Sequence, residues 1–114
     1  ISQATPGETS EKIRERVISA RAIQTERFRN YRNVHCNAQM SERMIHEFAE
    51  PDAASVQLLR DAMERLKLSA RAYNRILKVA RSIADLDGSE AVLVQHIAEA
   101  IGYRNLDRSD WAER

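Results

Sequence analysis

The sequence predicts an all-α protein, in which one long N-terminal helix precedes a four-helix bundle. The 114 residues include only 3 Gly and 2 Pro, whereas strand-rich folds need frequent turn residues. Ala, Arg, Glu, Leu and Ile dominate, and this mixture favours helices because most of these side chains lose little rotamer freedom there. The length is that of one domain with a single modest core.

Local signals along the chain predict where these parts begin and end. Pro6 and Gly7 lie in a start without apolar periodicity, which indicates a linker. Asn side chains after residue 29 compete with helical hydrogen bonds and predict an irregular loop. In order, we expect a linker (1–8), a connecting helix (9–29), a loop (30–40), a helical bundle (41–104) and a polar tail (105–114).

The connecting helix has only a narrow apolar stripe. Thr9 or Ser10 can cap its start. Charged side chains cover most of the remaining surface, so we expect this helix to pack against another body on one side only. The stripe consists of Ile13, Val17, Ala20 and Phe28.

The bundle region contains four segments with helix start or stop signals. Ser41, Asp52 and Ser69 are suitable N-caps for three helices. Gly88 can end the third of these in the left-handed conformation that Gly tolerates. A final helix is expected from about Val94 to Tyr103. Its expected inward-facing residues are Ile97, Ala98 and Ile101.

The helix from Ser69 to Asp85 has the clearest amphipathic pattern. Its apolar residues recur at i, i+3 and i+4 and fall within about one third of the circumference. They are Tyr73, Ile76, Leu77, Ala80, Ile83 and Ala84. The opposite side is basic, and a charged face of this kind is usually solvated. Its cations are Arg71, Arg75 and Lys78, with Arg81 at the edge.

The position of Arg71 suggests more than a solvated face. It lies in the first turn, where a cation is unfavourable against the helix dipole, so an anionic partner would relieve it. An Arg beside free backbone N–H groups at a helix N-terminus suits a phosphate. Arg71 is therefore the leading candidate for a phosphate contact, with Arg75 and Lys78 as candidates for further contacts.

The charge balance argues against a dedicated DNA-binding domain. The formal charge is +1 with 31% charged residues, whereas phosphate neutralisation calls for a larger basic excess. Cys36 is the only cysteine, which fits a reducing cytoplasm. No apolar run approaches the roughly 18–20 residues that span a bilayer, and the start has neither an initiator Met nor a signal peptide. We expect a cytoplasmic part of a longer protein, with no membrane partner.

No catalytic or metal site is expected within this chain. A phosphate-cradling loop needs closely spaced Gly followed by Lys and Ser or Thr, and the sequence has no such run. His35, Cys36 and His46 lack the paired spacing of a zinc site, and His96 lies far along the chain. Cys36 has no partnered His base, so we do not expect it to act as a nucleophile.

The run Leu68-Ser-Ala-Arg-Ala-Tyr-Asn-Arg-Ile-Leu-Lys-Val-Ala-Arg-Ser-Ile-Ala-Asp-Leu86 resembles the C-terminal domain of the magnesium-chelatase-like AAA+ ATPases, ComM/YifB type. The resemblance covers about residues 7–108, which makes it more specific than any short motif. The other matching segments are Gly7-Glu-Thr-Ser, Ile13-Arg14-x-Arg16-Val17, Ala20-Arg21, Asn37-Ala-Gln39, Ala62-Met63-Glu64-Arg65-Leu66 and His96-Ile-Ala-Glu-Ala-Ile-Gly-Tyr-Arg104.

The resemblance implies an AAA+ lid: a helical bundle over ATP that is bound by a preceding α/β core of the same polypeptide. Arg71 matches the family's sensor-2 arginine, which reaches the γ-phosphate, while no firm role follows for Arg75. ATP and Mg²⁺ are implied for the full-length protein only, because the family's phosphate loop, magnesium-holding carboxylate and arginine finger lie upstream of Ile1. ComM-type relatives are associated with DNA processing as hexameric ring motors, and chelatase relatives insert magnesium into a porphyrin.

Two alternatives remain open from the sequence. A self-standing nucleic-acid-binding module would use the four cations Arg71, Arg75, Lys78 and Arg81, and it predicts salt-dependent DNA binding. A protein-docking module would use the apolar stripe of the first helix, and it predicts self-association or a protein partner.

Overall fold

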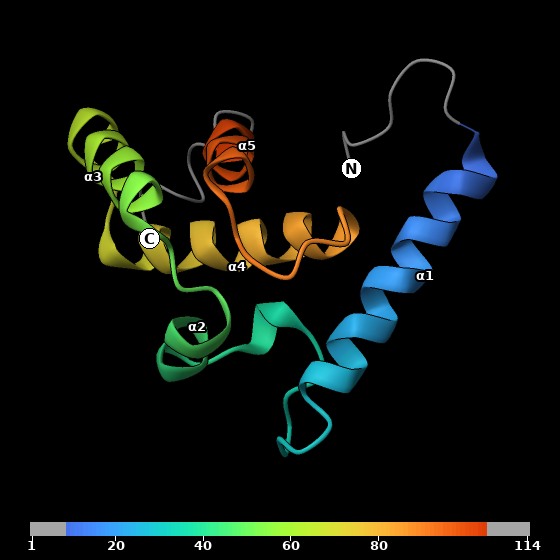
Figure 1. Cartoon of the computed structure of the whole chain (residues 1–114). Coiled ribbons are helices and arrows are strands. Elements are labelled where there is room, and N and C mark those ends of the chain that lie inside the picture. Colours follow the sequence, from blue (N-terminus) through green and yellow to red (C-terminus); the bar gives the residue numbers. More distant parts are fainter. Residues whose placement is uncertain (1–8, 105–114) are drawn as a thin grey trace.

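The computed structural model describes residues 9–104, and within this range the chain is entirely helical and loop, with no strand (Figure 1). The predicted all-α fold is therefore confirmed. The elements are α1 (Ser10–Arg27), the short 3-10 helix η1 (Asn37–Gln39), α2 (Glu42–Phe48), α3 (Ala53–Leu66), α4 (Ala70–Leu86) and α5 (Val94–Arg104).

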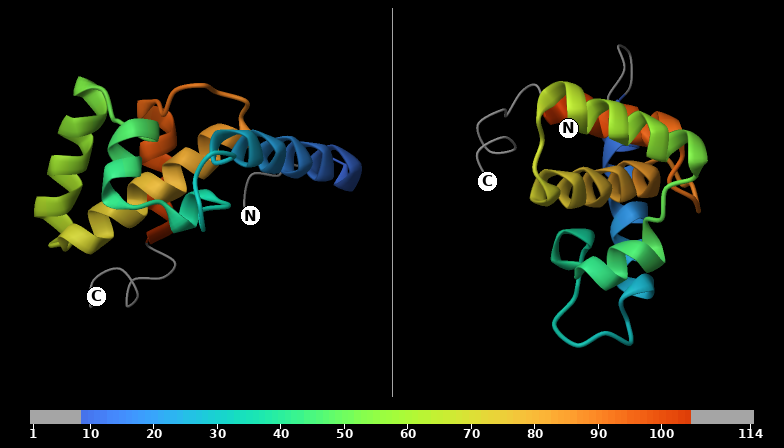
Figure 2. Two further views of the ribbon diagram at one scale, coloured as in Figure 1. Left: turned by 90° about the horizontal axis from the view of Figure 1, so that it is seen from below. Right: turned by 90° about the vertical axis from the view of Figure 1, so that its left-hand side faces the viewer.

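Helix α4 runs through the centre of the molecule. On one side it packs against α5, which in turn packs against α3, and on the other side it contacts α2 and η1 (Figures 1 and 2). Helix α1 crosses the C-terminal end of α4 and extends beyond it. Every other element of the fold is thus arranged around the helix that carries the predicted site.

The hydrophobic core forms along the apolar face of α4. Ile76, Leu77, Ala80, Ile83 and Ala84 are all buried there, as the helical spacing predicts, whereas Tyr73 is half-buried. A second patch of the core is aromatic and lies where α1 ends. It consists of Phe28, Tyr31 and Phe48, whose rings meet edge to face with centroids 5.7–6.3 Å apart.

The predicted helix caps are present in the structure. The side chains of Thr9, Ser41, Asp52 and Ser69 each accept a hydrogen bond from the backbone N–H three residues on. Hydrogen bonds from Ser55 lower the pKa of the Asp52 carboxyl below its ordinary value. These four caps explain why α1, α2, α3 and α4 begin where they do.

Gly88 ends α4 in the predicted manner. Its φ of 72° lies in the left-handed region. The Gly88 N–H donates to the Asp85 carbonyl (3.1 Å) and the Ser89 N–H to the Ala84 carbonyl (2.8 Å), which is the Schellman arrangement. The helix extends to Leu86, one residue past the expected end.

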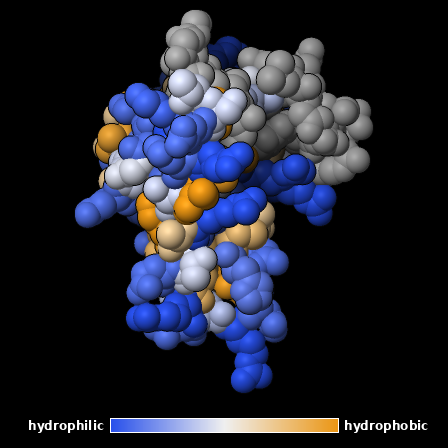
Figure 3. Space-filling model, turned by 90° about the vertical axis from the view of Figure 1, so that its right-hand side faces the viewer, coloured by the Kyte–Doolittle hydropathy of each residue, from blue (hydrophilic) through white to orange (hydrophobic). Residues whose placement is uncertain are grey.

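Helix α1 packs weakly along its length. Ala20 is its one buried residue, and the predicted stripe residues Ile13 and Val17 are half-buried. Ile18 and Ile23 are 58% and 37% exposed. Seen from the side of α1, hydrophobic residues form a broken band between hydrophilic regions (Figure 3). One-sided packing of this helix agrees with the sequence, and the narrow stripe is its cause.

One residue of the final helix was wrongly placed from the sequence. Ala98 is exposed, and Ala100 takes the fully buried position between Ile97 and the half-buried Ile101. At about 100° per residue, Ala100 lies within about 60° of Ile97, whereas Ala98 lies about 100° from it, outside the buried face. The predicted linker 1–8 and tail 105–114 lie outside the described residues, so the division of the chain into these parts stays a prediction.

Candidate functional site

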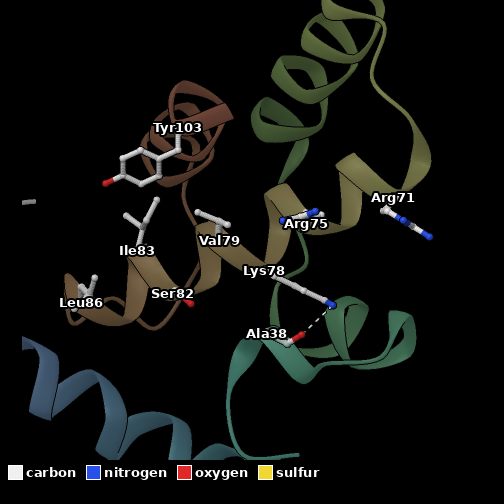
Figure 4. Close-up of a pocket in the computed structure, with 9 residues that line it drawn as sticks. All are labelled: Ala38, Arg71, Arg75, Lys78, Val79, Ser82, Ile83, Leu86 and Tyr103. Carbon is white, nitrogen blue, oxygen red and sulfur yellow. Dashed lines mark hydrogen bonds between the residues drawn. The ribbon is translucent and has the colours of Figure 1, made fainter. Parts of the chain in front are cut away.

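A cavity of ≈ 740 Å³ lies along α4, beside the apolar face that forms the core (Figure 4). One part of its wall is cationic and another part is apolar. The lining residues from α4 are Arg71, Arg75, Lys78, Val79, Ser82, Ile83 and Leu86, joined by Ala38 from η1 and Tyr103 from α5. The structure therefore brings the three predicted site residues to one cavity.

The cations share this cavity because of helical spacing. Arg71, Arg75 and Lys78 follow each other at i, i+4 and i+7, which places them on one stripe of α4. Arg71 is exposed and, among residues 9–104, makes no hydrogen bond or ion pair. It lies two residues after the cap Ser69, so the first-turn position expected from the sequence is correct.

Lys78 has a structural contact within the cavity. Its Nζ donates a hydrogen bond of 3.1 Å to the backbone carbonyl of Ala38, and Figure 4 shows the side chain pointing toward η1. Val79 and Ile83 point instead toward α5, where Tyr103 lies. Of the cations in the cavity, Lys78 thus points toward η1, whereas the apolar Val79 and Ile83 point toward α5.

Arg81 does not belong to the basic face, and this part of the prediction is wrong. The residue is 3% exposed. Its guanidinium donates to the carbonyls of Phe48 (3.0 Å), Glu90 (3.0 Å) and Ser89 (2.8 Å) and pairs with Asp85 at 3.1 Å. Burial lowers the pKa of Arg81, while the charge of Asp85 raises it and that of Arg27 lowers it. Because α2 and the loop after α4 enclose this side chain, Arg81 holds the fold together.

A second polar cluster, centred on Asp85, was not foreseen from the sequence. Arg27 at the end of α1 makes a bidentate pair with Asp85, with N–O distances of 2.8 and 2.7 Å. Asn37 of η1 donates to the same carboxylate at 2.8 Å and accepts from Arg27 at 2.9 Å. The partners are up to 58 residues apart, so no local spacing could reveal them. The one signal was the matching segment Asn37-Ala-Gln39, which looked like ordinary loop.

The histidines and the cysteine do not form a metal centre in the described part of the chain. No three His, Cys, Asp or Glu side chains of residues 9–104 lie close enough to hold a metal ion. His96 is buried, accepts from the Leu93 N–H at 3.0 Å through Nδ1 and contacts Asp87 at 2.9 Å through Nε2. These contacts connect the start of α5 to the end of α4. No helix among these residues is both long and apolar enough to cross a bilayer.

The fold and this cavity define an all-α domain with a cationic stripe that starts at a helix N-terminus. Residues 7–104 match the family described as "Magnesium chelatase, subunit ChlI C-terminal". The chain is 41% identical over 102 residues to competence protein ComM of Haemophilus influenzae and 38% identical over 103 residues to protein YifB of Escherichia coli. Each alignment covers 90% of this chain and 19% of the relative.

The chain therefore belongs to the magnesium-chelatase-type C-terminal domain family. An uncharacterized protein of Mycobacterium tuberculosis, 34% identical over 101 residues, extends the similarity to a third organism. The chain spans about a fifth of the length of these curated relatives, since it covers 19–20% of each.

Proposed function

We propose that this domain is the lid of a magnesium-chelatase-like ATPase and that Arg71 contacts the γ-phosphate of ATP bound by the upstream core. The observation that supports this most directly is the location of Arg71. It is exposed, lies in the first turn of α4 and lines a cavity together with Arg75 and Lys78. A planar guanidinium beside two further cations suits a polyphosphate.

The backbone at the start of α4 also favours a phosphate. The first N–H groups of a helix have no intrahelical partner. The hydroxyl of Ser69 accepts from the Ala72 N–H, which leaves the N–H groups of Ala70 and Arg71 directed out of the helix end. Together with the positive end of the helix dipole, they favour an anion at this place.

The same cavity does not suit Mg²⁺. Magnesium prefers carboxylate, phosphate and water oxygens. The lining contains no Asp or Glu among the described residues. In the proposed complex the upstream core therefore supplies the phosphate loop and the metal ligands, and this domain supplies cations. The reaction chemistry stays with the core, and the role of Arg71 is to bind and orient the phosphate end of the nucleotide.

The wider role of the full-length protein is a proposal of the same kind. We propose that the lid converts the presence of the γ-phosphate into movement within a cytoplasmic homo-oligomeric ring, a hexamer, that acts in DNA processing. The family membership supports the ATPase part, and the printed name of the Haemophilus relative, a competence protein, supports the DNA part.

Replacing Arg71 by Ala in the full-length protein tests the proposal. A hydrogen bond to a charged group contributes about 1.5–3 kcal/mol, so we expect kcat for ATP hydrolysis to fall about 10- to 100-fold. Arg60→Ala, an exposed Arg on α3, is the matched control and should leave turnover unchanged. Unchanged turnover in Arg71→Ala would rule out the γ-phosphate contact.

The alternative of a nucleic-acid-binding module has lost one of its four cations, because Arg81 is buried, and a second one, Lys78, is hydrogen-bonded to Ala38. It still predicts that this chain binds a DNA duplex at low salt and that log K falls with log salt. We expect no measurable binding of the isolated chain at 50 mM salt. Salt-dependent binding that is abolished in Arg71→Ala would favour the alternative.

A further inference from the structure

The Asp85 cluster places one buried carboxylate between two guanidinium groups. The side chain of Asp85 is fully buried, and those of Arg81 and Arg27 are 4% and 11% exposed. Arg27 contacts Asp85 through both terminal nitrogens, which fixes the orientation as well as the distance of the pair. The guanidinium also lies 5.8 and 5.9 Å from the ring centroids of Phe28 and Phe48.

The cluster connects three elements that are distant in sequence. Asn37 of η1 donates to Asp85 and, at 3.1 Å, to the hydroxyl of Ser82 on α4. The Asn37 backbone N–H donates to the side chain of Gln24 on α1 at 2.9 Å. Hydrogen bonds from one small region therefore join α1 and η1 to the C-terminal end of α4.

Helix α1 has few other firm attachments. Ala20 is its one buried residue, and Ile18 is 58% exposed. A second cavity, of ≈ 480 Å³, separates the earlier turns of α1 from the end of α4. An 18-residue helix with so narrow an apolar stripe is marginal by itself. The attachments at its C-terminal end, which are the cluster and Phe28, therefore contribute strongly to its direction relative to α4.

The cluster also borders the candidate site. Ser82, which accepts from Asn37, lines the main cavity, and so does Ala38, which follows Asn37 and accepts from Lys78. Lys78 of the cationic stripe is thus linked to Arg27 through its hydrogen bond to Ala38, the peptide bond between Ala38 and Asn37, and the hydrogen bond from Arg27 to Asn37.

We propose that Asp85 and Arg27 act as positioning residues that fasten α1, η1 and α4 into one rigid body, so that a movement of α4 on binding an anion at Arg71 is carried to α1. The second half of this statement rests on the proposed function. Helix α1 is about 27 Å long, from 18 residues at 1.5 Å each, so a rotation of about 10° at its fastened end moves the other end by about 5 Å. The connecting helix would act as a lever on the part of the protein to which it leads.

Hydrogen exchange of the full-length protein without nucleotide tests the fastening. Arg27→Met keeps the apolar stem and leaves Asp85 with Arg81 and Asn37. We expect amides of α1 to exchange about tenfold faster or more, because the detached helix opens more easily, while α3 and α5 are unchanged. Arg29→Met, an exposed Arg that pairs with Glu26, is the control and should leave α1 as in the wild type. Unchanged exchange of α1 in Arg27→Met would overturn the fastening.

The same measurement with a non-hydrolysable ATP analogue tests the transmission. In the wild type and in Arg29→Met, we expect nucleotide-dependent protection in peptides from both the start of α4 and α1. In Arg27→Met the response of α4 should remain, and that of α1 should fall below one third of the wild-type difference. A full α1 response in Arg27→Met would overturn the transmission.

The two proposals can fail separately. If ATP sensing by Arg71 is wrong, the wild type will show no nucleotide response at α4, but the nucleotide-free comparison still decides the fastening. Arg27→Lys is the second variant if Arg27→Met does not fold. It keeps the charge and loses the bidentate geometry, and it should give a smaller increase of α1 exchange in the same direction.

Discussion

The two ends of α4 carry the same residue types and use them in opposite ways. At the N-terminal end, Arg71 is exposed and lines a cavity without a carboxylate among its described residues. At the C-terminal end, Arg81 is buried against three carbonyl groups and Asp85. The difference arises from what encloses each side chain. The end of α2 and the loop after α4 enclose Arg81, whereas Arg71 is exposed at the start of the helix. A buried Arg needs a partner for its charge, whereas an exposed Arg is available for a ligand.

The two ends of α4 therefore differ in role: the buried residues stabilise the fold, and the exposed residues are available to bind a ligand. The buried end contains two guanidinium groups and one carboxylate, so each of them depends on the others. At the exposed end, Arg71 lies in the first turn of α4, where the helix dipole is unfavourable for a cation. Substitutions at the buried C-terminal end should therefore change the free energy of unfolding, and those at the exposed N-terminal end should change nucleotide turnover.

The largest effect is expected for Asp85→Asn. This change removes the one carboxylate between Arg27 and Arg81 and leaves two buried guanidinium groups without a counter-charge. Breaking a buried pair costs about 3–5 kcal/mol, which should be visible in the free energy of unfolding from urea titration. Asp61→Asn, on the exposed surface of α3, is the control and should change it by less than about 0.5 kcal/mol. A loss below about 1 kcal/mol in Asp85→Asn would mean that the cluster is not the structural centre of this end.

The second prediction compares two arginines on one helix. Arg81→Met leaves the carbonyls of Phe48, Ser89 and Glu90 without their donor but keeps the pair between Arg27 and Asp85. We therefore expect a smaller loss of stability than for Asp85→Asn, about 2–3 kcal/mol. Arg71→Met removes an exposed side chain and should stay within about 0.5 kcal/mol. Thermal unfolding of both variants measures the difference in stability. Equal losses of stability would contradict the assignment of Arg81 to the fold and of Arg71 to binding.

The fold could be predicted largely from local signals. Ser41, Asp52 and Ser69 cap the expected helices, and Gly88 ends α4, because capping depends on residues within one turn of the helix end. The apolar face of α4 was equally clear from its spacing. The three cations of the cavity follow from the same periodicity, although the cavity itself, with Ala38 and Tyr103, depends on other elements.

The buried polar end could not be predicted in the same way. Asp85 lies about 180° around α4 from Ile76, since nine residues at about 100° each bring it to the far side of the apolar face. Periodicity assigns such a position to solvent. It is buried because α1 and η1 cross there, and its partner Arg27 is 58 residues away. Arg81 was assigned to the basic face for the same reason. The periodicity of one helix reveals its apolar face, but it does not reveal which other elements pack against the remaining sides.

The smallest effect is expected from the cap at the exposed end of α4. Ser69→Ala removes the acceptor of the Ala72 N–H and should cost about 1 kcal/mol, whereas Ser69→Gly should cost only a few tenths. Because Arg71 lies in the same first turn, fraying of that turn should also lower ATP turnover of the full-length protein. Arg71→Met is expected to lower turnover at unchanged stability. A loss of both stability and turnover in Ser69→Ala would therefore indicate that the guanidinium is displaced, whereas in Arg71→Met it is absent. If Ser69→Ala reduces stability by the expected amount and turnover stays at the wild-type level, the first turn of α4 does not hold Arg71 in its working position, and the exposed end of the helix is only a surface.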